Sequence, residues 1–182
     1  MDGTLLDRES SIEQFIFMQY DRFDRHLSRI PKIDYAKRFI ELDCLGHVWK
    51  DKVYQTLVAE FNLDRIGWQE LLADYESQFQ FHCVPFPFLF EMLDALKQQG
   101  YLLGIITNGR GEFQKKAISG LGIQEYFDVI LISEIEGMRK PQPEIFQKAM
   151  IQLGIKPENS FFVGDNPEAD IEGAKNAKMH TI

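Results

Sequence analysis

The sequence has 182 residues, of which 45% are apolar or aromatic, and this length suits one domain or one core domain with a smaller insertion. Its 28 Asp and Glu residues against 20 Lys and Arg residues give a formal net charge of -8. A chain this acidic lacks the basic footprint that nucleic acids require, so we expect no nucleic-acid partner, whereas a local positive pocket for a small anion stays compatible with it.

The two cysteines and the hydropathy pattern bear on location. Cys44 and Cys83 lie far apart and have no metal-like spacing. Because two thiols do not make a disulfide framework, we expect a reducing, cytoplasmic location. No apolar run approaches the length of a membrane span, and no basic head precedes an apolar stretch at the N-terminus, so we expect no membrane partner. The sequence leaves the oligomeric state open.

The first part of the chain is expected to form a small α-helical domain at residues 11-80. This region is rich in aromatic residues and poor in glycine, and its apolar residues recur near helical spacing. Breaks near Pro31 and Gly67 divide it into about four helices.

After Pro85 the pattern changes to alternating helices and strands. The predicted helices span residues 88–99, 112–121, 143–153 and 169–177, and the predicted strands span residues 101–106, 128–133, 160–163 and 180–182. The apolar run at 101–106 is typical of a strand buried on both faces. This alternation predicts an α/β fold with a Rossmann-like, doubly wound parallel sheet. We therefore expect an α/β core at 1-10 and 81-182, with the helical domain at 11-80 inserted in it.

Polar residues follow the predicted strands of the core, and one more, Asp2, stands at the start of the chain. Carboxylates, a hydroxyl, an amide and an amine are provided by Asp2, Thr107, Asn108, Lys140, Asp165 and Asp170. In a doubly wound sheet, ligands bind at the carboxyl ends of the strands. Carboxylates hold Mg²⁺ through oxygen, and a hydroxyl, backbone N–H groups and a lysine stabilise a phosphoryl group in transfer. The sequence therefore predicts a phosphoryl-transfer site at this edge.

Each of these residues also has an ordinary explanation. Asn108 with Gly109 forms a common turn dipeptide, and Lys140 could be an ordinary solvated surface lysine. Asp165 could simply cap the helix that follows it. Their shared position after buried strands is what favours a functional interpretation.

In this order the clusters resemble the four signature motifs of the haloacid dehalogenase superfamily. The first family motif reads Asp-x-Asp-Gly-Thr, and Met1 to Thr4 supply x-Asp-Gly-Thr. Thr107-Asn108 matches the second motif, Lys140 the third, and Gly164-Asp165 with Asp170 the fourth. The resemblance implies an HAD-like fold whose α-helical cap is inserted between the first and second motifs.

The resemblance also implies a role for each residue. Asp2 would protonate the leaving group and then activate water, and its backbone carbonyl would help bind Mg²⁺. Thr107 and the backbone of Asn108 would hold the phosphoryl oxygens, and Lys140 would neutralise charge. Asp165 would ligate the metal directly, and Asp170 would do so directly or through a water, so the implied metal residues are Asp2, Asp165 and Asp170.

The implied activity is that of a Mg²⁺-dependent phosphatase acting through an aspartyl-phosphate on a small phosphorylated metabolite, such as a sugar phosphate, phosphoglycolate or a nucleotide. The nucleophilic aspartate belongs two positions before Asp2 and would precede Met1, so we expect the polypeptide from Met1 to be inactive without it. Three alternatives stay open: a 2-haloacid dehalogenase, a phosphomutase of the same fold, and an inactive binding protein or truncated fragment.

Overall fold

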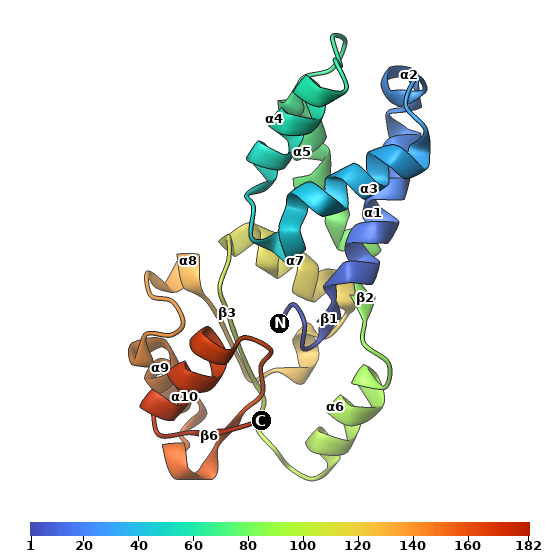
Figure 1. The fold of residues 1–182 in the computed structure, drawn as a ribbon. Helices are drawn as coiled ribbons and strands as arrows, with labels where there is room; N and C mark the ends of the chain where they lie inside the picture. Colours follow the sequence, from blue (N-terminus) through green and yellow to red (C-terminus); the bar gives the residue numbers. More distant parts are fainter. The chain divides into compact units, whose positions relative to one another are not determined.

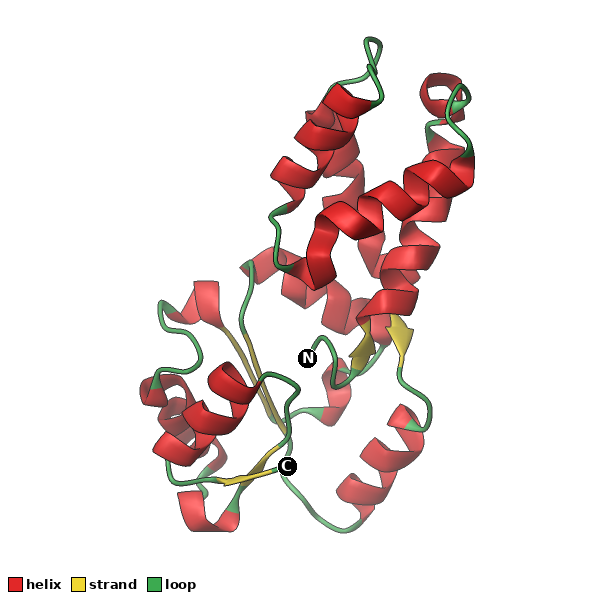
Figure 2. Cartoon of the chain, in the orientation of Figure 1, coloured by secondary structure: helices red, strands yellow, loops and turns green.

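The computed structural model describes residues 1–182, which divide into two compact units. Arg8–Val84 forms a helical unit, and Met1–Asp7 with Pro85–Ile182 forms an α/β unit (Figure 2). These bounds lie a few residues from those expected for the inserted domain and the core. None of the helices is both long enough and apolar enough to cross a membrane.

The helical unit contains four longer helices and one short one (Figure 1). They are α1 (Arg8–Arg22), α2 (Asp24–Leu27), α3 (Lys32–Asp43), α4 (Lys50–Glu60) and α5 (Trp68–Gln78), with 3₁₀ turns at Cys44–Gly46 and Phe79–His82. Helix α3 begins directly after Pro31 and α5 directly after Gly67. The unit thus has five helices where about four were expected, and a helix begins directly after each of the two expected breaks.

Aromatic side chains fill the interior of the helical unit. The ring of Phe15 meets that of Tyr75 edge-on, with 5.2 Å between the centroids. The polar groups buried with these rings are paired: the Tyr54 hydroxyl donates to Gln19 Oε1 at 2.9 Å, and Gln19 Nε2 donates to the Leu71 carbonyl at 2.9 Å. Because buried polar groups are costly when unpaired, these bonds stabilise one arrangement of the helices.

The α/β unit alternates strands and helices from α6 onward. Its elements are α6 (Leu89–Gln98), β3 (Gly104–Thr107), α7 (Gly111–Leu121), β4 (Val129–Ile132), α8 (Ser133–Glu136), α9 (Pro143–Leu153), β5 (Phe161–Phe162), a π-helix (Pro167–Glu172), α10 (Gly173–Asn176) and β6 (His180–Thr181). The two-residue strands β1 (Leu6–Asp7) and β2 (Val84–Pro85) mark the points where the chain passes from one unit to the other.

The strand pairs of this unit are parallel, as the predicted α/β class requires. β3 pairs with β4, placing Ile105 opposite Ile130, and β5 pairs with β6, placing Phe161 opposite His180. The strands form separate two-stranded pairs rather than the single sheet that we expected, because no strand is hydrogen-bonded to the second edge of β3 or of β5.

Two elements of the α/β unit begin more than one residue away from the sequence expectation. The strand expected from Tyr101 begins at Gly104, and Tyr101 is 55% exposed. The reason is that Tyr101 donates its backbone N–H to the Leu96 carbonyl at 3.1 Å, which closes the end of α6. The helix expected at 169–177 begins earlier, as a π-helix, because Asn166 Oδ1 accepts the backbone N–H groups of Glu168 and Ala169.

The core of the α/β unit lies between the β3–β4 pair and helices α9 and α10 (Figure 1). Ile106 and Leu131 from the strands meet Ile145 and Phe146 from α9 and Ala174 from α10. Each buried side chain of this size contributes about 1.5–3 kcal/mol relative to an exposed one. This packing fixes the carboxyl ends of β3 and β4, where the predicted site residues begin.

Candidate active site

All six predicted site residues belong to the α/β unit, and Lys140, Asp2, Asp170 and Asp165 lie near enough to the Met1 nitrogen to influence its charge. Burial lowers the pKa of this amino group, Lys140 lowers it further, and Asp2, Asp170 and Asp165 oppose that change. Asp165 also approaches Gly3 closely, and the Lys140 ammonium contacts the Asp170 carboxylate. The structure therefore brings the first, third and fourth motifs together.

Lys140 and Asp170 form a buried ion pair. The Lys140 ammonium contacts Asp170 Oδ1, and the two side chains are only 7% and 5% exposed. The second oxygen, Asp170 Oδ2, accepts the backbone N–H of Asn166 at 3.2 Å. Charges removed from water are tolerated when both are paired and hydrogen-bonded, as these are. In this arrangement Lys140 neutralises Asp170.

The side chain of Asn108 connects the second motif to the third. Its carboxamide is hydrogen-bonded twice to the main chain of Lys140. The sequence analysis gave Asn108 a role only through its backbone, so this use of the side chain was missed. The structure thus places Asn108 and Lys140 side by side.

Three further residues hold the turn after β3, and the sequence analysis singled out none of them. The Thr107 hydroxyl donates to Gln114 Oε1 at 3.1 Å. The backbone N–H of Gly109 donates to Ser133 Oγ at 3.0 Å, and that of Gly111 donates to Glu134 Oε2 at 2.6 Å. The sequence features that could have pointed to these residues were the place of Ser133 and Glu134 directly after an apolar run, and a glutamine on the apolar face of α7.

Asp165 lies against the backbone of Gly3. Gly3 has a φ of +70°, and a Cβ atom placed there would lie 2.7 Å from the Asp165 carboxyl carbon. Glycine is therefore required at this position for its conformation and for the space that it leaves. Close by in sequence, Asp2 Oδ1 is the one buried side-chain oxygen or nitrogen that has no hydrogen-bond partner in the protein.

An unpaired buried carboxylate oxygen fits a site that receives a cation or a proton-bearing ligand. No group of three or more His, Cys, Asp or Glu side chains is gathered tightly enough to hold a metal by itself. Mg²⁺ does not require such a group, since it keeps several waters and uses one or two carboxylates. The oxygen donors of Asp2, Asp165 and Asp170 are therefore compatible with Mg²⁺.

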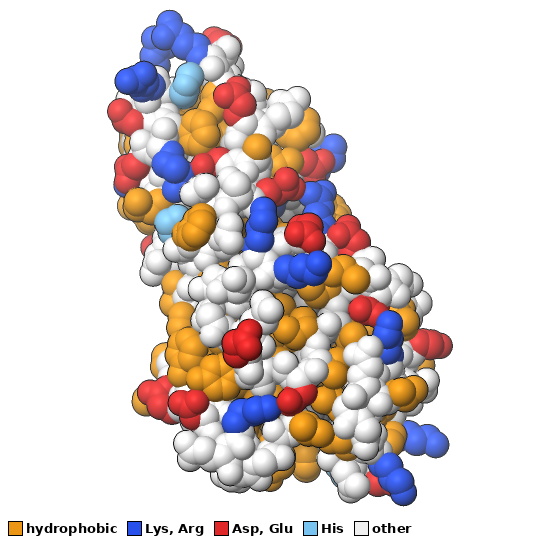
Figure 3. Space-filling view, turned by 180° about the vertical axis from the view of Figure 1, so that it is seen from behind, with side chains coloured by type: hydrophobic (Ala, Val, Ile, Leu, Met, Phe, Trp, Pro, Cys, Tyr) orange, Lys and Arg blue, Asp and Glu red, His pale blue; other side chains and the backbone are white.

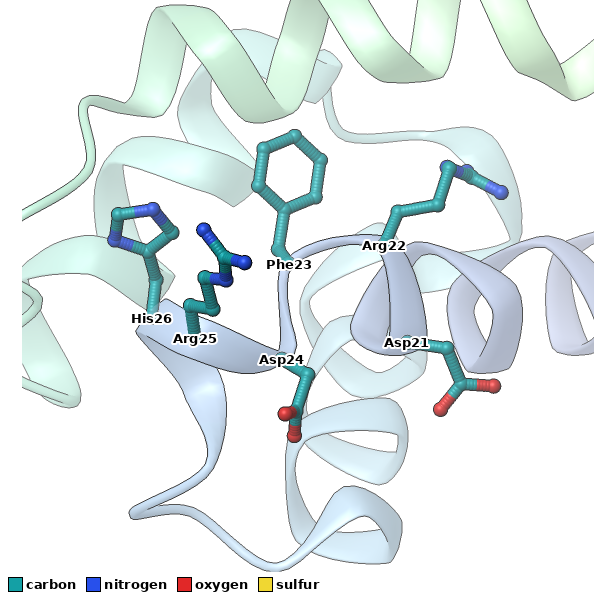
Figure 4. Close-up of a pocket in the computed structure, with 6 residues that line it drawn as sticks. All are labelled: Asp21, Arg22, Phe23, Asp24, Arg25 and His26. Carbon is teal, nitrogen blue, oxygen red and sulfur yellow. The ribbon is translucent and has the colours of Figure 1, made fainter.

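A surface hollow in the helical unit contains none of these residues. It lies at the junction of α1 and α2 and is lined by Asp21, Arg22, Phe23, Asp24, Arg25 and His26 (Figure 4). Two of these charges are already used, since Arg22 pairs with Asp74 and Asp21 with Lys32. Basic side chains gather over the α2 end of this unit, whereas elsewhere on the face shown the two signs of charge are interspersed (Figure 3).

Comparisons with known proteins identify the family of this chain. A family model described as haloacid dehalogenase-like hydrolase matches residues 1–182. The pyrophosphatase PpaX of Bacillus cereus is 30% identical over 183 aligned residues, which cover 100% of this chain and 78% of that protein. The glyceraldehyde 3-phosphate phosphatase of Pyrococcus furiosus is 40% identical over 108 residues, which cover 56% of this chain and 45% of that protein.

The chain thus matches less than half of the length of the Pyrococcus furiosus relative. Among solved structures, the putative HAD-hydrolase YfnB of Bacillus subtilis bound to magnesium is similar to this chain, with a TM-score of 0.72 and 24% sequence identity. The match covers 100% of this chain and 84% of the YfnB chain, and it shows that the two folds are alike. The match of the family model over residues 1–182 shows that this chain belongs to the haloacid dehalogenase-like hydrolase family.

Proposed function

We propose that this protein is a Mg²⁺-dependent phosphatase of small phosphorylated metabolites that acts through an aspartyl-phosphate whose nucleophile precedes Met1. The observation that carries the proposal is the buried ion pair of Lys140 and Asp170, in the same unit as the Asp165 carboxylate packed against Gly3 and the unpartnered Asp2 Oδ1. A buried ammonium and carboxylate oxygens near the carboxyl end of β3 provide for both an anionic group and a divalent ion.

Each residue has a chemical task in this proposal. The carboxyl group of Asp2 gives a proton to the leaving oxygen and later takes one from the water that releases phosphate. Thr107 and the Asn108 N–H donate hydrogen bonds to phosphoryl oxygens, and the ammonium of Lys140 offsets their charge. Mg²⁺, held by the Asp2 carbonyl, Asp165 and Asp170, would supply further charge neutralisation at these oxygens.

The relatives support the substrate class and the metal. The two matched proteins are a phosphatase and a pyrophosphatase, and the YfnB structure is described as bound to magnesium. We infer that the helical unit is the family's cap and selects among small phosphorylated metabolites. Neither Cys44 nor Cys83 is in a disulfide, which favours a reducing compartment such as the cytoplasm.

Two measurements test the proposal. The chain from Met1 to Ile182 should bind Mg²⁺ and inorganic phosphate in isothermal titration calorimetry, and EDTA should remove the phosphate binding. The same chain, preceded by an apolar strand and an aspartate directly before Met1, should hydrolyse p-nitrophenyl phosphate with Mg²⁺ and stop in EDTA. Full hydrolysis in EDTA would contradict the metal assignment.

The alternatives give different results in the same assays. A 2-haloacid dehalogenase would release chloride from 2-chloropropionate without a metal. A phosphomutase would transfer the phosphoryl group to a second sugar hydroxyl instead of water. A binding protein would bind phosphate and hydrolyse neither substrate, even with the aspartate in place.

A further inference from the structure

The side chain of Gln114 is buried against the hydroxyl that the proposed function uses to bind phosphate. Gln114 lies on α7 and is 5% exposed, and Thr107 is 4% exposed. The Thr107 hydroxyl donates to Gln114 Oε1 at 3.1 Å, and this is the hydrogen bond that holds the Gln114 side chain within the protein. A glutamine amide bonded through its oxygen alone can turn over and exchange its oxygen and nitrogen, while the rest of the side chain stays in place.

The direction of this hydrogen bond matters because a hydroxyl has one proton. While Thr107 donates to Gln114 Oε1, it has no proton to give to a phosphoryl oxygen. If the amide of Gln114 turns over, its nitrogen donates to Thr107 Oγ1, and the threonine proton becomes available to the ligand. We propose that Gln114 is a positioning residue that turns the Thr107 hydroxyl toward bound phosphate, an inference that rests on the proposed function.

The surroundings of Gln114 favour this role. The side chain lies directly against Gly109, where an added Cβ atom would be 2.9 Å from Gln114 Cγ and 3.0 Å from its amide nitrogen. The absence of a side chain at Gly109 therefore gives the amide its space. The backbone N–H of Gln114 donates to the Arg110 carbonyl at 3.0 Å, which fixes the start of the side chain in the first turn of α7.

Substitutions of Gln114 distinguish its amide acting as a hydrogen-bond donor to Thr107 from the same amide acting as an acceptor. Methionine has a similar length and neither donates nor accepts strongly, so Gln114→Met leaves the hydroxyl of Thr107 without a partner. An ionised glutamate only accepts, so Gln114→Glu should keep the threonine proton directed away from the ligand. When that carboxyl is protonated it can donate again, and burial raises the pH at which this happens.

The test measures the affinity of the chain for inorganic phosphate with Mg²⁺ present, by calorimetry. Thr107→Val removes the hydroxyl itself and should lower the affinity about tenfold or more, because a hydrogen bond to a charged ligand is lost. Gln114→Met keeps the hydroxyl but no longer orients it, so its loss of affinity should be smaller, and it should vanish in the Thr107→Val background. The matched control is Gln124→Met at an exposed glutamine, which should bind like the unmodified chain.

If Gln114→Met proves unstable, Gln114→Glu supplies the second test. The ratio of its phosphate affinity to that of the unmodified chain should rise as the pH falls from 8 to 5, and this rise should disappear in the Thr107→Val background. Unchanged affinity in Gln114→Met, or losses that multiply with Thr107→Val, would overturn the role of Gln114. If the unmodified chain itself binds no phosphate, the proposed function fails first, and the inference fails with it.

Discussion

The carboxamide of Asn108 is hydrogen-bonded to both main-chain groups of Lys140. Asn108 Nδ2 donates to the Lys140 carbonyl at 2.9 Å, and the Lys140 N–H donates to Asn108 Oδ1 at 3.0 Å. A side-chain amide that matches a backbone N–H and C=O in this way fixes position and direction together. Asn108, which directly follows β3, therefore fixes the main chain of Lys140, whose ammonium contacts Asp170.

Asn108→Asp should loosen this connection. The carboxylate can still accept from the Lys140 N–H, but it cannot donate to the Lys140 carbonyl and places an oxygen against it. We expect a loss of about 1–3 kcal/mol in the free energy of unfolding, measured by urea denaturation, since a buried acceptor loses its partner. The control is Asn159→Asp at an exposed asparagine, and equal unfolding midpoints for the two variants would contradict the expectation.

The ion pair of Lys140 and Asp170 should show strong coupling. Lys140→Met leaves a buried carboxylate without its cation, which costs about 3–5 kcal/mol in the free energy of unfolding. Lys140→Met combined with Asp170→Asn should cost less than Lys140→Met alone. The exposed pair of Lys115 and Glu112, changed to Met and Gln in the same way, should couple by less than about 1 kcal/mol. Additive costs at Lys140 and Asp170 would show that the pair is not formed.

Gly3→Ala should damage the metal site more than the fold. Gly3 and Gly122 both have a φ of +70°, but an added Cβ atom meets the Asp165 carboxylate at Gly3 and meets nothing within 4 Å at Gly122. Gly122→Ala should therefore cost only about 1 kcal/mol of conformational strain and leave Mg²⁺ affinity unchanged. Gly3→Ala should also lower Mg²⁺ affinity in calorimetry. Equal Mg²⁺ affinities in the two variants would show that Asp165 is not a ligand of the metal.

Asp128 should make stability depend on acid pH. The Leu103 N–H, at 2.8 Å, and then Lys97 lower the pKa of the Asp128 carboxyl below its ordinary value. Since the folded pKa is the lower one, the stabilisation is complete above the ordinary value of about 3.9 and is lost as the pH falls through the folded pKa. Asp128→Asn should lower the melting temperature at pH 7, and the gap should close in acid.

The control for this pH dependence is the exposed Asp64. Asp64→Asn should leave the melting temperature almost unchanged across the same pH range. A gap for Asp128→Asn that stays constant between pH 7 and pH 2 would rule out the charged hydrogen bond as its cause.

Local signals predicted the helices well. The helix predicted at 143–153 is α9, because Pro143 stands in its first turn and Gly154 ends it with a φ of +67°. The prediction that a strand begins at Tyr101 was wrong, because hydropathy alone does not show that the Tyr101 N–H closes the end of α6. Apolar composition predicts a strand, whereas the backbone hydrogen bonds decide where it begins.

The site was predictable to the extent that its residues follow strands. Thr107, Lys140, Asp165 and Asp170 could be selected because parallel strands end at one edge, and Asp2 because Gly3 and Thr4 follow it as in the first family motif. Their partners could not be selected, since the bond from Thr107 to Gln114 depends on how the first turn of α7 packs, and those from Asn108 to Lys140 join residues 32 positions apart. Contacts of this kind leave no periodic trace in the sequence.

The position of a bound divalent ion is the most direct measurement. Crystals of the chain grown with Mn²⁺ in place of Mg²⁺ and with inorganic phosphate should give one anomalous peak within coordination distance of the Asp2 carbonyl and the Asp165 carboxylate, with phosphate between it and Lys140. Asp165→Asn should lose the peak and keep the fold. A peak that lies away from Asp2 and Asp165, or that persists in Asp165→Asn, would contradict the account.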